Sequence, residues 1–198
     1  MSRNDRKWET GQIPIEVISG RVHPSRNEIR TGKSAMDINK IPVLLRREIE
    51  ARIAGPLIKA FMEEFGKEKT IEIASGVILK LAQENGRDLA SRAGGNSFDD
   101  LANATTQWSA GGAIEREVLD KSENNYDFNI VRCKYAEMYK ELGLADMGFI
   151  FSCGRDGSMY SGFNEKIKLE RTQTIMQGAA YCDFRLSIDE EAVSDEKG

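Results

Sequence analysis

Residues 113–133, AIEREVLDKSENNYDFNIVRC, decide the fold. The segment AIEREVLD alternates apolar and polar residues in part, and YDFNIVRC alternates again, which is typical of strands with one buried face. Between them, KSENN supplies polar residues that favour a turn. We therefore expect an antiparallel hairpin after Gly111 and Gly112. The apolar period of the chain changes here from about 3.6 residues to about 2, so helices precede the hairpin.

The segment before this point begins with a helix predicted from Pro42 onward. Every fourth residue is apolar, which lines one face of a helix. Gly55-Pro56 is expected to kink it, because proline removes a backbone donor and its ring meets the preceding turn. The apolar positions are Leu45, Ile49, Ile53, Leu57, Phe61 and Phe65.

Two further helices are predicted before the hairpin. The first covers residues 68–91 and ends at Gly94-Gly95. Ser97 has the properties of an N-cap for the second, because acidic residues follow it in the first turn, and this helix runs to about Trp108. The first half of the chain is therefore expected to be helical.

After the hairpin, helical spacing returns in CKYAEMYKELGL, with Gly143 as its stop. KIKLERTQTIM, residues 166–176, and YCDFRLSI, residues 181–188, then alternate as strands do. The strands are expected to form a meander around one helix. The predicted fold is α+β, with a helical N-terminal half packed on a small antiparallel β-sheet formed mainly by the C-terminal half.

Composition limits the organisation and the class of partner. The 198 residues, 40% of them hydrophobic, predict one α+β domain over residues 41–188, an arm over 1–40 and an acidic tail over 189–198. A net charge of -4 argues against a nucleic-acid partner, and no apolar run is long enough for a membrane span. A small-molecule substrate is expected, and the apolar patch IPIEVI of the arm would suit a homo-oligomer.

Cysteine and histidine counts limit the chemistry. Three cysteines without a signal-peptide core predict free thiols in a cytoplasmic protein. His23 is the only histidine, so a site with three histidine ligands is excluded, and we expect it at the surface. The thiols show no Cys-x-x-Cys spacing, so we expect no metal and no other cofactor.

The stretch FSCGRDGSMYSGFN, residues 151–164, carries the main candidate site. It places Cys153 three residues from Asp156 among small and polar residues, which indicates an exposed turn or the wall of a cavity. The two side chains would share one face only if the segment were helical. Asp156 also has a purely structural alternative, as a turn-forming or helix-capping side chain.

The C-terminal third resembles the L-2-amino-thiazoline-4-carboxylic acid hydrolase family. The likeness covers about residues 128–185, and Glu165 departs from it, because proline is usual there. The elements that carry the resemblance are Cys133 before a YAE-type helix, Cys153 with Asp156, Gly162 to Asn164, Arg171 with Thr172 and Thr174, and Gly178 with Cys182 and Phe184.

The resemblance implies a hydrolase that opens a small cyclic amidine, or a related heterocycle or cyclic carbonyl compound, with water. The family's named activity converts aminothiazoline carboxylate to N-carbamoyl-cysteine. The C-terminal part also resembles, more distantly, the ligand-binding domains of vesicle-tethering subunits and haem-type gas sensors. The alternative is therefore a non-catalytic small-ligand-binding or assembly module on the same scaffold.

The residues suggest two routes for such a ring opening. Asp156 could hold the protonated amidine and activate water, with Cys153 shaping the pocket. Alternatively Cys153 could attack as a thiolate, provided that a positive neighbour such as Arg155 or a backbone donor lowers its pKa. Both routes make Cys153 and Asp156 the candidate catalytic residues.

Four more residues are candidates for substrate binding: Cys133, Arg155, Arg171 and Cys182. Arg171 could hold a substrate carboxylate through two parallel hydrogen bonds, although an arginine on an amphipathic strand often faces only solvent. The cysteines have a structural alternative, because free cysteine behaves as a small buried hydrophobe.

Overall fold

The computed structural model describes residues 38–188. The arm predicted over residues 1–40 lies outside the described residues except for a 3-10 turn at Ile38–Lys40, labelled η2. The predicted acidic tail and His23 also lie outside them. Among the described residues, no helix has the length and apolar character to cross a membrane.

The hairpin forms as predicted. Strand β1 spans Ile114–Lys121 and pairs antiparallel with β2, Asn125–Cys133. At the turn, the Ser122 N–H donates to the Asn125 carbonyl over 2.8 Å. Two irregularities in β1, between Glu115 and Arg116 and between Val118 and Asp120, break its register. They account for the imperfect alternation of AIEREVLD, because a bulge shifts the following side chains to the other face.

The sheet is antiparallel throughout, but its order is not that of a meander. The order is β1-β2-β4-β3, so β4, Cys182–Ile188, lies between β2 and β3, Ile167–Glu170. The strand expected over residues 166–176 is also too long. After Glu170 the backbone N–H groups of Thr172 and Gln173 donate to the Asp183 carboxylate, and a 3-10 turn, η5, follows at Ile175–Gln177.

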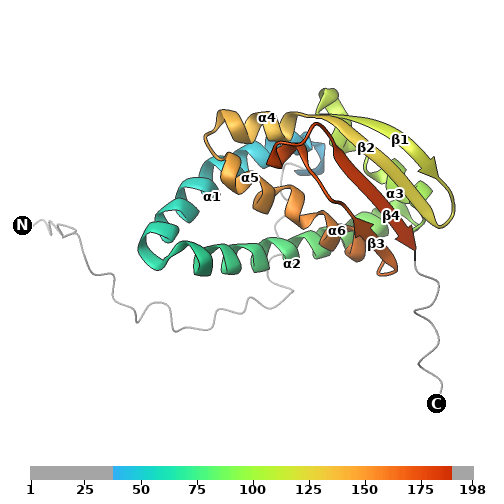
Figure 1. Ribbon diagram of the computed structural model, residues 1–198. Helices are drawn as coiled ribbons and strands as arrows, with labels where there is room; N and C mark the ends of the chain where they lie inside the picture. The colour runs from blue at the N-terminus through green and yellow to red at the C-terminus, as the bar shows by residue number, and fades with distance from the viewer. Residues whose placement is uncertain (1–37, 189–198) are drawn as a thin grey trace, which may run out of the picture. The chain divides into compact units, whose positions relative to one another are not determined.

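The helical N-terminal half confirms the predicted α+β class, and Figure 1 shows α2 running beneath the sheet with α3 and α6. Ser97 is the predicted N-cap, in a capping box with Asp100. The third helix stops at Ala104 and continues as a 3-10 segment, η3, Thr106–Gly112. The α-helices are α1, Val43–Phe65; α2, Lys67–Ala93; α3, Phe98–Ala104; α4, Lys134–Glu141; α5, Ala145–Phe151; and α6, Asp156–Phe163.

The main core lies between the sheet and α2, α3 and α6. Phe128 of β2 stacks on Phe184 of β4 with ring centroids 4.8 Å apart. Two glycines allow α2 and α6 to pack unusually closely, because a Cβ atom built at Gly86 or at Gly162 would lie 2.1 Å from a backbone oxygen of the other helix. This close contact fixes the position of α6, which carries the candidate site at its first residue.

A second apolar cluster lies under α1 and contains residues of α4 and α5. Its buried members are Ala51, Met138, Tyr139, Leu144 and Met147. Helix α1 runs through Pro56 and buries Val43, Ala51 and Gly55. The apolar stripe predicted along α1 exists, but it is not the buried face, because the exposed fractions of its six side chains range from 46% at Leu45 to 67% at Phe65.

Candidate functional site

The stretch around Cys153 is helical rather than the turn expected from its small and polar residues. Helix α5 ends at Phe151, a 3-10 turn, η4, covers Cys153–Arg155, and α6 begins at Asp156. Residues 151–158 are neither fully exposed nor fully buried, since all of them have intermediate exposure. The helical path meets the condition under which residues three apart share a face.

Arg171, between β3 and η5, joins the sheet side of the molecule to this helical segment. Its Nη1 atom lies 2.6 Å from Oδ2 of Asp156, and its Nη2 atom donates to the Cys153 carbonyl over 2.8 Å. The side chain of Arg171 is 9% exposed and that of Asp156 is 23% exposed. The guanidinium also lies over the ring of Phe184, 4.9 Å from its centroid. Arg171 therefore holds the carboxylate in a fixed place that solvent still reaches.

The three thiols gather around this ion pair. The charge of Asp156 helps to raise the thiol pKa of Cys133, Cys153 and Cys182, and none of the three forms a disulfide. Cys182 is buried, and its Sγ accepts the Ile175 N–H over 3.2 Å. Cys133 is half-buried at the end of β2. The tertiary structure thus brings together residues from β2, η4, α6, the loop after β3, and β4. We call this group the Asp156 cluster; its members are Cys133, Cys153, Arg155, Asp156, Arg171 and Cys182.

Burial keeps the thiols protonated. It raises the pKa of Cys133 to about 11, and it raises the pKa of Cys182 as well. For Cys153, burial and then the charge of Asp156 raise the thiol pKa, while Arg171 opposes the shift. The positive neighbour required for a thiolate is present, but its effect is smaller than that of burial.

Burial also shifts the charged groups of the cluster. It raises the pKa of Asp156, although the charge and hydrogen bond of Arg171 oppose the shift. For Arg155, burial and the charge of Arg47 lower the guanidinium pKa to about 10. Arg155 therefore stays cationic at neutral pH, and Asp156 is a stronger base than an ordinary carboxylate.

Residues of α1 and two tyrosines surround the cluster and were not found from the sequence. Arg47 and Glu50 of α1 form an ion pair with each other. The charge of Arg47 also lowers the pKa of both Arg155 and Asp156. Tyr139 of α4 lies near Arg155 and Cys153, and Tyr160 of α6 lies near Asp156. No local pattern could have identified Arg47, because α1 reaches the cluster only through tertiary packing.

The cluster does not form a metal site within residues 38–188. Among these residues, no three His, Cys, Asp or Glu side chains are placed to hold one ion. Asp156, the acidic member of the cluster, is bonded to Arg171 instead.

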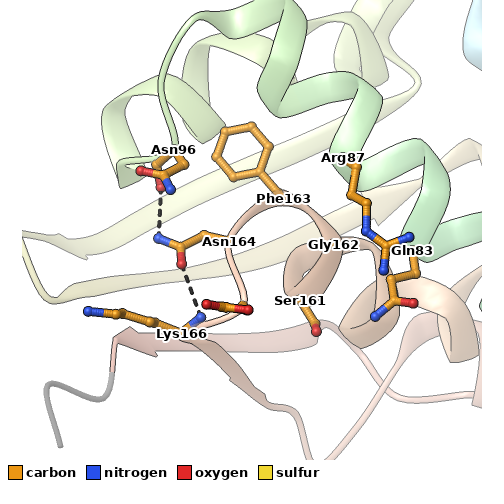
Figure 2. A pocket seen from close by; sticks show the side chains of 9 residues that line it. Gln83, Arg87, Asn96, Ser161, Gly162, Phe163, Asn164 and Lys166 are labelled. Carbon is orange, nitrogen blue, oxygen red and sulfur yellow. Dashed lines mark hydrogen bonds between the residues drawn. The ribbon is translucent and has the colours of Figure 1, made fainter. Parts of the chain in front are cut away.

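A separate pocket of about 470 Å³ lies at the other end of α6. Figure 2 shows Gln83 and Arg87 on one side of it and Asn164 on the other, where the Asn164 side chain donates to the Asn96 carbonyl and accepts the Lys166 N–H. The ends of α6 are about 10 Å apart, so this pocket is distinct from the Asp156 cluster. Asn164 therefore shapes the turn, and Glu165, at the position usual for proline, is exposed at its rim.

Two solved structures are similar to the described part of the chain at low sequence identity. One is the phenol-responsive sensory domain of the transcription activator PoxR with phenol, with a TM-score of 0.49 and 14% identity over 74% of this chain and 76% of that one. The other is a trafficking protein particle complex subunit 3 from Naegleria fowleri covalently bound to palmitic acid, with a TM-score of 0.47 and 12% identity over 74% and 96% of the two chains.

The comparison with curated proteins gave no significant match. The family profile described as L-2-amino-thiazoline-4-carboxylic acid hydrolase matches residues 46–186, which include most of α1, all of α2 to α6, the first three strands and most of β4. The matched segment contains every residue of the Asp156 cluster. The chain therefore belongs to the L-2-amino-thiazoline-4-carboxylic acid hydrolase family.

Proposed function

We propose that the protein is a hydrolase that opens a small cyclic amidine, or a related heterocycle or cyclic carbonyl compound, by addition of water. Family membership supports the hydrolase class. The observation that carries the proposal is the partly exposed Asp156 carboxylate, held by Arg171 at 2.6 Å beside Cys153. A partly exposed carboxylate in a fixed position could accept a proton from a water molecule, as general-base catalysis of water addition needs.

In the proposed reaction, a water oxygen bonds to the amidine carbon while the water proton passes to Asp156. The bond between that carbon and the ring sulfur then breaks, and the sulfur takes the proton from Asp156. The second water proton moves from the new hydroxyl to the ring nitrogen, which leaves a carbonyl at the former amidine carbon. For aminothiazoline carboxylate, the product is the N-carbamoyl-cysteine thiol, and no oxidant or reductant is needed. The raised pKa of Asp156 suits both proton transfers, because a carboxyl group acts best when its pKa approaches the working pH.

Arg171 and Arg155 have different parts in this proposal. Arg171 is occupied by Asp156 and the Cys153 carbonyl, so it is a positioning residue. Arg155 makes no ion pair with Asp156 within residues 38–188 and keeps its charge at neutral pH, so it is the better candidate for a substrate carboxylate.

Of the two routes, direct attack by water is the better supported. A thiol whose pKa is raised by burial is a poor nucleophile, because the thiolate is the reactive form. We therefore assign Cys153, with Cys133 and Cys182, to the wall of the site. No cofactor enters the reaction, and we place the protein in the cytoplasm, where the thiols would stay reduced.

A small-ligand-binding or assembly module is the second candidate. It is favoured by the same ion pair, because a carboxylate already bound to arginine and surrounded by protonated thiols can serve a purely structural purpose. In that case the cluster would hold α6 against the sheet without any proton transfer.

Mass spectrometry separates the two functions. The purified full chain is incubated with aminothiazoline carboxylate and a panel of cyclic amidines and imides, alongside Asp156→Asn, Cys153→Ser and the control Asp146→Asn. Asp146 is exposed on α5, so the control removes a carboxylate outside the cluster. Gain of one water by a panel member, lost in Asp156→Asn but kept in Cys153→Ser and Asp146→Asn, supports the proposal. Equal binding by all four proteins without hydrolysis supports the binding module.

A further inference from the structure

Helix α1 exposes a continuous apolar surface that the monomer leaves uncovered within residues 38–188. We call it the α1 outer face. Its central residues Ile49, Ile53 and Leu57 are 49%, 63% and 52% exposed. Ile49 and Ile53 each lie about 160° around the helix from the fully buried Ala51, because each residue turns the helix by about 100°. The α1 outer face consists of Ile49, Ile53, Leu57 and Phe61, while Leu45 and Phe65 extend the stripe to the two sides of the helix, about 160° apart.

The area of the α1 outer face suits the centre of an interface. A large apolar side chain has about 200 Å² of surface, so four that are about half exposed leave on the order of 400 Å². This value is within the range of the largest apolar patch of a monomer and is about half of the roughly 800 Å² that each partner buries in a standard interface. The α1 outer face can therefore supply the apolar centre of a contact between two copies.

The charges along α1 run against its own helix dipole. Arg46 lies near the N-terminus, where the first turn has no acidic residue, and its neighbour Arg47 already pairs with Glu50 of the same helix. Glu63 and Glu64 lie in the last turn, which has no basic residue and where the helix carbonyls are negative. An antiparallel neighbour would correct this order, because it brings an acidic end to each basic end.

We propose that the α1 outer face binds a second copy of this chain, with the two α1 helices antiparallel about a two-fold axis near Gly55. The sequence of α1 is symmetric in this arrangement. Ile53 is as far before Gly55 as Leu57 is after it, and the same holds for Ile49 and Phe61. Apolar residues of one copy therefore lie opposite apolar residues of the other, as a two-fold interface requires.

The pairing of the helix ends limits the packing angle. Acidic and basic ends of two 23-residue helices come together only when the helices cross at a small angle, such as the roughly +20° that results when ridges of residues four apart pack into grooves between residues three apart. The four residues of the α1 outer face then lie along the contact, while Leu45 and Phe65 lie at its edges. The interface is independent of the proposed hydrolysis, since none of its residues belongs to the Asp156 cluster.

The test measures the mass of the full chain by sedimentation and light scattering over a range of micromolar concentrations. We expect a dimer for the wild type. Ile53→Glu should weaken it at least about 100-fold, because two charges would be buried at the crossing. Val77→Glu is the matched control, since Val77 is an apolar residue of α2 with 55% exposure, and it should leave the dimer unchanged. Circular dichroism and thermal melting confirm that each variant is folded.

Cysteine cross-linking tests the direction of the helices. Chains carrying Ile53→Cys are mixed with chains carrying Leu57→Cys and oxidised mildly, with the wild type as control for the native thiols. The antiparallel arrangement predicts that the mixture forms more cross-linked dimer than either variant alone. Equal cross-linking of each variant with itself would contradict it, because that result requires a parallel pair.

Several other results would overturn the proposal. A wild type that stays monomeric over the whole range excludes a second copy as the occupant. If Ile53 and Leu57 are then protected from labelling only when residues 1–37 are present, the chain's own N-terminal segment covers the surface. If the wild type sediments with neutral lipid vesicles and Ile53→Glu does not, the occupant is a lipid surface.

Discussion

Arg171 is the residue on which the candidate site depends most. Its guanidinium contacts a carboxylate on α6, the carbonyl of Cys153 in η4 and the ring of Phe184 on β4. Because the side chain is 9% exposed, water replaces few of these contacts when the arginine is removed. Loss of Arg171 therefore leaves a carboxylate without its partner, which is more costly than the loss of a surface ion pair.

We expect Arg171→Met to lower the free energy of unfolding by about 3 kcal/mol at neutral pH. The double variant Arg171→Met with Asp156→Asn should be more stable than Arg171→Met alone, since the unpaired charge is then gone. Urea denaturation of the wild type, both single variants and the double variant measures this coupling. Additive effects would mean that the ion pair contributes nothing.

The cost of Arg171→Met should also depend on pH. Without Arg171, the folded-state pKa of Asp156 rises further above that of the unfolded chain, because the opposing charge is gone. The folded variant then binds the proton more tightly than the unfolded one, so its stability falls as the pH rises above about 4. Urea denaturation from pH 4 to neutral pH should show the destabilisation growing with pH, and a constant difference would contradict this.

The thiols predict a loss of stability in alkali. Burial raises the pKa of Cys133 from 9.0 to about 11, so the unfolded chain loses its thiol proton first. The free energy of unfolding is therefore highest below about pH 9. It falls as the pH rises through about 11, by about 3 kcal/mol from Cys133 alone. Denaturation between pH 8 and pH 10 should show this fall, and Cys133→Ala should reduce its slope. Tyr135 and Tyr139, with pKa values of about 12, contribute only at higher pH.

At the scale of elements, the contact between α2 and α6 fixes the site. Gly86 and Gly162 allow the two backbones to meet, since a Cβ atom at either position would lie 2.1 Å from an oxygen of the other helix. The first residue of α6 is Asp156, so any shift of α6 also moves the carboxylate away from Arg171.

Two alanine substitutions in α2 should have opposite effects. Gly86→Ala should destabilise the protein by about 3 kcal/mol, because backbone atoms cannot move aside as a flexible side chain can. Gly76→Ala in the same helix should stabilise it by up to about 1 kcal/mol, since nothing lies within 4 Å and alanine favours a helix. Thermal melting of both variants tests this, and similar effects at both sites would contradict the close contact.

At the scale of the whole molecule, the two largest of the three apolar clusters among the described residues involve different helices. The larger lies between the sheet and α2, α3 and α6, and the smaller lies under α1 with α4 and α5. The smaller cluster has few buried residues, and the opposite side of α1 is exposed. We therefore expect α1 to open more readily than the central strands.

Hydrogen exchange at two protein concentrations tests this order together with the proposed dimer. Amides of β2 and β4 should be the best protected and should not depend on concentration. Amides of α1 should exchange faster and should gain protection as the concentration rises, because association would stabilise the helix. Protection of α1 that is equal to that of the strands at the lower concentration would contradict the expected order.

Local chemistry explains what could be predicted from the sequence. The hairpin, the N-cap at Ser97 and the helical first half depend on residues close together in the chain, and all three are confirmed. The family likeness also pointed to Cys153, Asp156 and Arg171 before their contacts were known. Their catalytic and binding assignments stay predictions, because contacts alone do not demonstrate a reaction.

The sequence by itself determined the periodicities, the turn and cap residues and the α+β class, because each follows from interactions within a few residues. Only the tertiary structure decided the position of β4 between β2 and β3, the helical path through Cys153 and the face of α1 that is buried. An apolar stripe shows that a helix has an apolar side, but it does not show whether the chain or a partner covers it. That choice depends on which surfaces distant segments already occupy, and here Ala51 and Gly55 face the core while Ile53 does not.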